Sequence, residues 1–221
     1  SNNSNTSVGR ESMDKNTTGA SNVAVGVYAL YGNTTASNNT AVGKSALETN
    51  TTGANNVGLG RSAGIAVTTG NDNTIIGDRA GTNVTTTGQN TFVGGRAGSQ
   101  ATGQHNTAIG FFSQYSPTTG NYNTTGGYNS LRHSTGGNYN TGFGYKALED
   151  STSGYENTVL GGHAGMNITT GDNNVAVGYN SMQSLTTAST NTAVGSRSLL
   201  YSQTGSANTA IGYEALKDTT T

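Results

Sequence analysis

Histidine and carboxylate side chains are where acid–base chemistry or metal binding would be expected, because both can transfer protons and ligate metals. The three histidines, His105, His133 and His163, fall at different positions of the repeat described below, so they cannot form a pair that recurs along the chain. The carboxylates do not recur in register either: Glu11, Asp14, Glu48, Asp72, Asp78, Glu149, Asp150, Glu156, Asp172, Glu214 and Asp218. The sequence therefore predicts no catalytic residue, no metal site and no cofactor. We expect that the protein is not an enzyme.

The glycines and the composition exclude further classes of function. None of the 34 glycines belongs to a phosphate-binding loop ending in Gly-Lys-Ser/Thr or to a calcium-binding nonapeptide repeat. The net charge of -1 gives no basic stripe for nucleic acid, and no apolar run is long enough for membrane insertion. With no Cys, disulfide and thiol chemistry are also absent.

One repeat organises all 221 residues. Counting from an asparagine at position 1, eleven of the twelve spacings are 17 residues, and the exception is the 16-residue step from Asn90 to Asn106. The opening residues are Asn5, Asn22, Asn39, Asn56, Asn73, Asn90, Asn106, Asn123, Asn140, Asn157, Asn174, Asn191 and Asn208. A fixed period of this kind is the signature of a repeat architecture.

The residue types within the repeat predict its geometry. Position 2 is always Thr or Val, position 4 is apolar except at Gly126, position 5 is always Gly and position 8 is always Ala or Ser. β-Branched residues at positions 2 and 4 favour a strand, and an invariant glycine directly after it indicates a corner. We therefore expect an all-β fold, a single-chain β-solenoid or β-roll of thirteen 17-residue coils. It would form one continuous repeat domain over residues 1–221, without separate cap domains.

Small and branched side chains are expected to be sealed inside the coils. Position 9 is Leu or Met in eight coils but Gly at Gly64, Gly81, Gly98 and Gly165, and those four coils carry Val67, Val84, Ala101 and Ile168 at position 12. Such an exchange of one apolar side chain for another is typical of a core with limited volume. The opening asparagines could form an inward ladder or stand exposed at a turn, and the sequence leaves both readings open.

One five-residue motif recurs along the chain with little change. Asn-Thr-Ala-Val-Gly occurs at 39–43 and 191–195, and Asn-Thr-Ala-Ile-Gly at 106–110 and 208–212. It resembles the glycine-rich head repeats of trimeric autotransporter adhesins, which form a β-roll, and the repeat arrays of phage tail-fibre-like proteins. The Thr-Thr-Gly link is closer to the second group, and the adhesin repeat is shorter than 17 residues. The resemblance implies a trimer and a place on a cell surface or virion.

Aromatic residues gather in the second half of the chain. Phe111, Tyr128, Tyr145, Tyr179 and Tyr213 share position 6, and Tyr122 and Tyr139 share position 17. Stacked coils would align them into a ridge. Aromatic faces bind sugars and tyrosine is enriched in interfaces, so surface glycans, a subunit contact and plain surface are the alternatives.

Two polar features also recur. The Thr-Thr pairs, such as Thr34-Thr35 and Thr51-Thr52, raise ice binding as a less favoured function, since adjacent residues on a strand point to opposite sides. Five Asn-x-Ser/Thr sequons precede these pairs at a corner that we expect to face solvent, where N-glycosylation could occur: Asn16, Asn33, Asn50, Asn83 and Asn167.

The expected function is a structural subunit of an extracellular fibre or filament. The last coil ends where Thr-Thr-Gly would continue, and joining Thr221 to Ser1 of another copy nearly preserves the repeat. Subunits would then associate head to tail in an open filament. The alternative is an adhesin or tail-fibre segment that binds surface glycans through the aromatic ridge.

Overall fold

The computed structural model describes residues 3–116 and 118–219, and over these residues the chain is all-β with no helix. The thirteen strands each have three residues and occupy positions 2 to 4 of the repeat. They are β1 Thr6–Val8, β2 Val23–Val25, β3 Thr40–Val42, β4 Val57–Leu59, β5 Thr74–Ile76, β6 Thr91–Val93, β7 Thr107–Ile109, β8 Thr124–Gly126, β9 Thr141–Phe143, β10 Thr158–Leu160, β11 Val175–Val177, β12 Thr192–Val194 and β13 Thr209–Ile211. The predicted β-solenoid is confirmed.

The chain divides into two compact units, Ser1–Thr107 and Ala108–Thr221, with the boundary inside β7. Both units are built from the same coil. Ser1, Asn2 and Thr221, on which the head-to-tail junction was predicted, lie outside the described residues.

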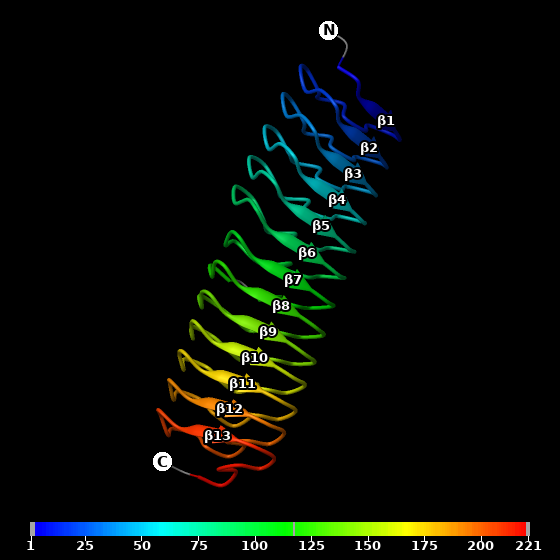
Figure 1. Ribbon diagram of the computed structural model, residues 1–221. Coiled ribbons are helices and arrows are strands. Elements are labelled where there is room, and N and C mark those ends of the chain that lie inside the picture. Colours follow the sequence, from blue (N-terminus) through cyan, green and yellow to red (C-terminus); the bar gives the residue numbers. More distant parts are fainter. Residues whose placement is uncertain (1–2, 117, 220–221) are drawn as a thin grey trace. The chain divides into compact units, whose positions relative to one another are not determined.

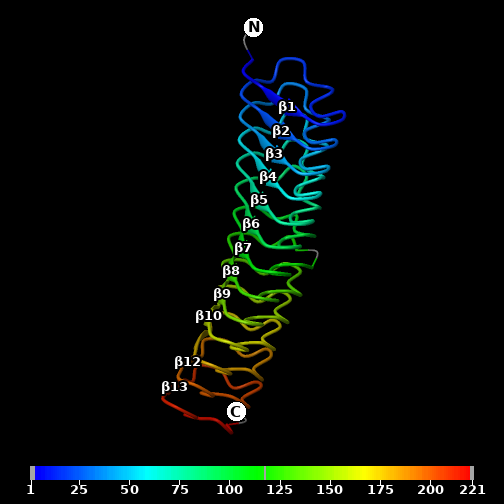
Figure 2. The same cartoon turned by 90° about the vertical axis from the view of Figure 1, so that its right-hand side faces the viewer.

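Within each unit, neighbouring strands are parallel and pair one repeat apart. In the first unit Thr40 pairs with Val57, Ala41 with Gly58 and Val42 with Leu59. In the second, β9 pairs with β10 and β10 with β11 in the same register. Figure 1 shows β1 to β6 as successive rungs on one side of their coils, and Figure 2 shows the return segments on the other side. Each coil is therefore one rung of a parallel sheet.

The middle residue of each strand points into the coil, and its two neighbours point out. Ala24, Ala41, Ile75 and Phe92 at position 3 have no exposed surface. By contrast, Val8 at position 4 is 57% exposed. The expectation that branched residues are sealed inside is therefore wrong for the strand residues of positions 2 and 4. Because side chains alternate along a strand, burying position 3 forces both neighbours outward.

The position-5 glycines turn the corner with φ between 120° and 142°, a region that only glycine adopts readily. A Cβ built on Gly77 would lie 2.4 Å from the carbonyl oxygen of Gly94, and the same overlap recurs at Gly26 and Gly43. Glycine is thus required at this position for two reasons: the positive φ angle and the close approach of the next coil.

The opening asparagines form the inward ladder, which settles the two readings left open by the sequence. Asn39 has no exposed surface, and its backbone N–H donates to Oδ1 of Asn22 at 2.8 Å. Its own Nδ2 donates to the carbonyl of Gly53 at 2.9 Å, across the coil. The ladder continues in the second unit, where the N–H of Asn140 donates to Oδ1 of Asn123 at 2.9 Å. A buried amide group is tolerated here because both ends are hydrogen-bonded.

The exchange of core volume predicted between positions 9 and 12 is present, and it extends to position 3. Val67, Val84, Ala101 and Ile168 are all fully buried. In three of the four coils with Gly at position 9, position 3 is also large: Ile75, Phe92 and Val159. A Cβ on Gly98 would lie 2.5 Å from the ring of Phe92, so the ring occupies the space that leucine fills elsewhere.

Replacing a corner glycine should destabilise the fold. For Gly77→Ala we expect a loss of at least about 2 kcal/mol in unfolding free energy, because strained φ and backbone overlap add together. Urea unfolding followed by circular dichroism measures it. Gly136→Ala is the matched control, since its φ is not in the positive region and the nearest atom to its Cβ would be 3.7 Å away. Equal stability of the two variants would contradict the role of the corner.

The shared core volume predicts coupling between Phe92 and Gly98. Gly98→Leu alone should cost roughly 1–3 kcal/mol by overpacking, and Phe92→Ala alone roughly 3–5 kcal/mol by leaving a cavity. The double variant recreates the Ala-and-Leu pattern of Ala41 and Leu47, so its cost should fall short of the sum by at least about 1 kcal/mol. Additive unfolding free energies would show that the two side chains do not compete for space.

Candidate functional site

Exposed aromatic side chains form the aromatic ridge, defined as the position-6 residues Phe111, Tyr128, Tyr145, Tyr179 and Tyr213. The first three come from successive coils of the second unit and stack face to face. The ring centroids of Phe111 and Tyr128 are 6.0 Å apart at 11°, and those of Tyr128 and Tyr145 are 5.5 Å apart at 9°. Position 6 follows the corner glycine, so the common register of the strands sets the rings above one another.

His163 fills a break in the aromatic ridge. Position 6 of its coil is Gly162, and a Cβ there would approach the ring of Tyr179 at 3.5 Å. The imidazole of His163, one position later, lies edge-on to Tyr145 at 5.1 Å and to Tyr179 at 6.1 Å. No role for His163 was predicted, although the glycine at an aromatic position was a signal that a neighbouring ring takes its place.

Tyr122 and Tyr139 form a second stack at position 17. Their ring centroids are 5.0 Å apart and their planes are within 3° of parallel. The rings are 46% and 58% exposed. Tyr213 lies apart from both stacks, with its hydroxyl oxygen 3.5 Å from Nη1 of Arg197.

Stacking determines what these aromatic side chains can bind. The stacked rings are nearly parallel with centroids 5.0 to 6.0 Å apart. Inserting a sugar ring between two of them would need roughly 7 Å between planes, twice the contact distance of carbon atoms. A sugar therefore cannot enter between neighbouring rings of a stack.

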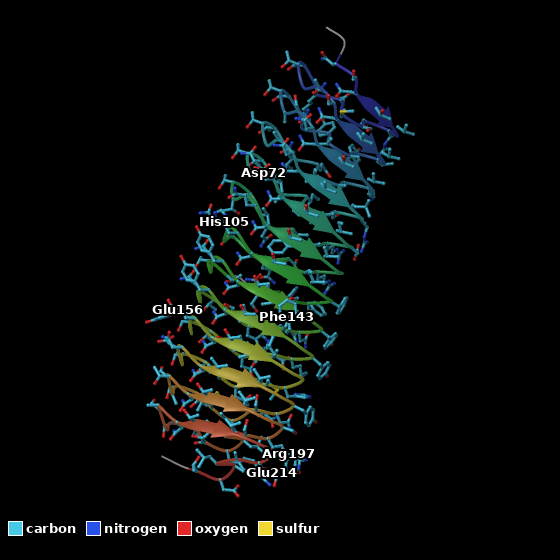
Figure 3. The ribbon with its side chains drawn as sticks, in the orientation of Figure 1. Asp72, His105, Phe143, Glu156, Arg197 and Glu214 are labelled. Atoms are coloured by element: carbon cyan, nitrogen blue, oxygen red, sulfur yellow. The ribbon has the colours of Figure 1, made fainter. Side chains whose placement is uncertain are left out.

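Ionisable groups at the surface pair across coils without converging on a reactive centre. Asp78 accepts hydrogen bonds from Nε and Nη2 of Arg61 at 2.7 and 3.0 Å, and these bonds lower the pKa of Asp78 and raise that of Arg61. Lys217 and then Arg197 lower the pKa of Glu214 in the same way. Figure 3 labels Arg197 and Glu214 near the end of the second unit. These shifts come from ion pairs at the surface, where each pair contributes little to stability.

Glu149 is the one carboxylate among the buried polar residues of the described chain. Its Oε1 accepts from Nδ2 of Asn129 at 3.0 Å, and its Oε2 lies 3.1 Å from Nζ of Lys146. This contact raises the pKa of Lys146. A buried carboxylate with these partners holds its coils together.

The histidines stay apart. His133 contacts Asp150, with 2.7 Å between Nδ1 and Oδ1, and Figure 3 labels His105 at the corner that position 17 occupies in the first unit. Among the described residues no group of three or more His, Asp and Glu side chains could hold a metal ion. Nor does the described chain contain a helix that could cross a membrane.

The Thr-Thr pairs have a structural role. In most pairs the first threonine donates its hydroxyl to the carbonyl of the matching residue in the next coil, as from Thr34 to Thr51 at 3.1 Å and from Thr51 to Thr68 at 3.1 Å. In the pair Thr118-Thr119 the second threonine donates instead, to the carbonyl of Thr135 at 3.3 Å. Second threonines such as Thr35 and Thr52 are exposed. One hydroxyl group in most of these pairs is therefore committed to coil stacking.

The five sequons differ in exposure. Asn83 is exposed and Asn16 and Asn167 are half-buried, but Asn33 and Asn50 have no exposed surface. The expected solvent-facing corner is thus wrong for these two. They occupy position 12, which points inward, and Nδ2 of Asn33 donates to Oδ1 of Asn16 at 2.8 Å. Asn50 continues this second, shorter amide ladder to Asn33 at 3.3 Å.

The outward sheet residues at positions 2 and 4 were missed as a candidate surface. The signal was present in the sequence, since both positions are restricted in residue type, but that restriction was read as burial.

A search for similar proteins finds no match among family models, curated proteins or solved structures. The resemblance to adhesin heads and tail-fibre repeats stays a prediction.

Burial predicts which sequons can carry a glycan. If the chain is secreted through a glycosylating pathway, folded molecules should carry glycans at Asn83 and none at Asn33 or Asn50, whose amides are buried hydrogen-bond donors. Peptide mass spectrometry of the folded fraction measures the occupancy. A glycan on Asn33 in folded protein would show that position 12 does not point inward.

Proposed function

We propose that this chain is a structural subunit of an extracellular fibre or filament, carried on a cell surface or a virion. The observation that supports it most is that each coil joins the next through the same atoms. The N–H of Thr40 donates to the carbonyl of Asn56 at 2.8 Å, and the N–H of Val57 donates to that of Asn73 at 2.8 Å. Stability is then a sum of nearest-neighbour interfaces that can be extended.

Head-to-tail association is the assembly that such a repeating interface supports. Any coil presents the backbone and asparagine donors that the coil after it requires, so a coil of another copy could take the same place. A contact of this kind is heterologous and does not close, and it produces filaments. The glycine corners keep successive coils at about one strand spacing, about 4.8 Å.

Adhesion to surface glycans is the second candidate, and the exposed aromatic ridge favours it. Tyr128 and Tyr145 are 44% and 49% exposed and carry hydroxyl groups that could bind sugar hydroxyls at the ring edges. The stacking of the rings argues against recognition through ring faces. Ice binding has less support, because one hydroxyl group in most of the Thr-Thr pairs is hydrogen-bonded within the solenoid.

A filament subunit should tolerate a change in coil number. Deleting residues 39–55 removes one complete coil and brings Asn38 next to Asn56, so the repeat continues. We expect unchanged β-sheet circular dichroism and, by electron microscopy, filaments of the same width as those of the unaltered chain. The physical reason is that every coil-to-coil interface is equivalent.

Deleting residues 39–47 is the matched control. It breaks the repeat, places strand residues opposite a return segment and should abolish both the spectrum and the filaments. Isolated particles of constant length at all concentrations of the unaltered chain would rule out the head-to-tail filament. Saturable glycan binding that is lost in Tyr128→Ala and Tyr145→Ala would favour the adhesin instead.

A further inference from the structure

The buried carboxylate of Glu149 contacts a lysine of its own coil and an asparagine of the coil before it. Its Oε2 lies 3.1 Å from Nζ of Lys146, and its Oε1 accepts a hydrogen bond from Nδ2 of Asn129 at 3.0 Å. Asn129 is 3% exposed and Glu149 is 6% exposed. One carboxylate thus bridges an amine and a carboxamide at a place that is almost closed to water.

The repeat holds the amine and the carboxamide at matching places. Asn129 and Lys146 both occupy position 7, in successive coils of the second unit, with φ of 57° and 58°. The backbone N–H of Lys146 donates to the carbonyl of Tyr128 at 2.9 Å, which fixes the register of the two coils at this point. The N–H of Glu149 donates to the carbonyl of Lys146 at 3.3 Å, so the chain turns back toward the lysine. Lys146 is the only lysine at position 7 in the thirteen coils.

Two buried polar atoms beside Glu149 have no hydrogen-bond partner among the described residues. They are Oδ1 of Asn129, which is an acceptor, and Nε of Arg132, which is a donor. Nη1 of Arg132 lies 3.9 Å from Oε1 of Glu149, so the guanidinium group and the carboxamide adjoin the same carboxylate. Buried polar atoms without partners are rare in folded proteins and require an explanation. A cation near a carbonyl oxygen favours attack on the carbonyl carbon, because it stabilises the negative charge that develops on the oxygen.

We propose that Lys146 and Asn129 form an isopeptide bond, an amide bond between their side chains, with Glu149 as the group that transfers the protons. Nζ of Lys146 is the nucleophile, Cγ of Asn129 is the carbon attacked and Nδ2 is the leaving group. Glu149 contacts the nucleophile and the leaving group at the same time, as a general acid–base catalyst must. This bond joins two coils within one chain and does not depend on the proposed fibre.

The reaction balances without a co-reactant. Glu149 takes a proton from Nζ of Lys146, and the free electron pair of Nζ attacks Cγ of Asn129. Glu149 then returns that proton to Nδ2 while the bond between Cγ and Nδ2 breaks. The ammonia that leaves takes a further proton from Nζ and departs as an ammonium ion, which carries away the positive charge of Lys146. No atom is oxidised or reduced.

The groups around Lys146 make the reaction slow. The hydrogen bond to Glu149 and the charge of that residue raise the pKa of Lys146, and Tyr145 and Asp150 add to the effect. The ion pair is therefore the resting state, and the proton must move to Glu149 before Nζ can attack. Folding brings the reacting groups together, so the bond should form gradually in the folded chain and not in the unfolded one.

Intact mass spectrometry of the full chain tests the proposal. Linked molecules should be lighter than the sequence mass by one ammonia, and their fraction should grow during incubation of the folded chain but not in concentrated urea. Protease digestion should release a branched peptide that joins the segments around residues 129 and 146. The branched peptide distinguishes the isopeptide bond from a succinimide at Asn129, which loses the same ammonia without involving Lys146.

Three single variants assign the roles. Lys146→Arg keeps the positive charge and removes the nucleophile, and Glu149→Gln keeps the size of the side chain and removes the proton carrier. Both should retain the circular dichroism of the unaltered chain and yield no branched peptide. Lys217→Arg is the matched control and should keep the bond. Lys217 also lies 3.1 Å from a carboxylate three residues away, that of Glu214, but no asparagine of the described chain shares that carboxylate.

Two results would overturn the bond. One is a folded, unaltered chain that keeps its full sequence mass after several weeks of incubation at neutral and mildly alkaline pH. The other is a loss of ammonia without a branched peptide, or with one that persists in Lys146→Arg. A branched peptide that forms at an unchanged rate in Glu149→Gln would show that Glu149 does not transfer the protons.

Discussion

After strands β1 to β5 and β7 to β12, the corner glycine approaches the carbonyl group of the glycine in the next coil so closely that no Cβ fits between them. This contact sets the distance between coils, and the distance in turn lets the strands pair in register and the opening asparagines reach one another. A larger residue at one corner would push two coils apart. It would weaken the strand pairing, the asparagine hydrogen bonds and the packing of the core at the same time. The remaining features of the structure depend on this spacing.

The narrow interior follows from the same constraint. Each coil encloses space for only a few apolar side chains, so Leu47 beside Ala41 is one solution, and Phe92 beside Gly98 is another. Buried asparagines enter this interior in ladders, because an amide in one coil finds a partner in the neighbouring coil. Oδ1 of Asn22 accepts from the backbone N–H of Asn39, and Oδ1 of Asn16 accepts from Nδ2 of Asn33 at position 12.

Different positions of the repeat determine the packing of the interior and the properties of the surface. Position 3 faces the core and can be Ala, Ile or Phe, whereas positions 2 and 4 face outward and, apart from Gly126, carry Thr or an apolar side chain. Charged pairs such as Arg61 and Asp78 lie at position 6, after the corner glycine. The outward strand positions are thus uncharged, and charged residues begin beyond the corner.

Sequence alone determined the coil length, the strand positions, the corner glycines and the exchange of core volume, because each of these is a local requirement that recurs in every repeat. The tertiary structure decided which side of each strand points inward, since alternation along a strand is the same whether Ala24 or Val25 is buried. It also decided that Asn33 is a core residue rather than a glycosylation corner, and that the rings of Phe111 and Tyr128 stack with their planes 11° apart. These outcomes depend on where the rest of the coil lies, and a three-residue strand contains no information about that.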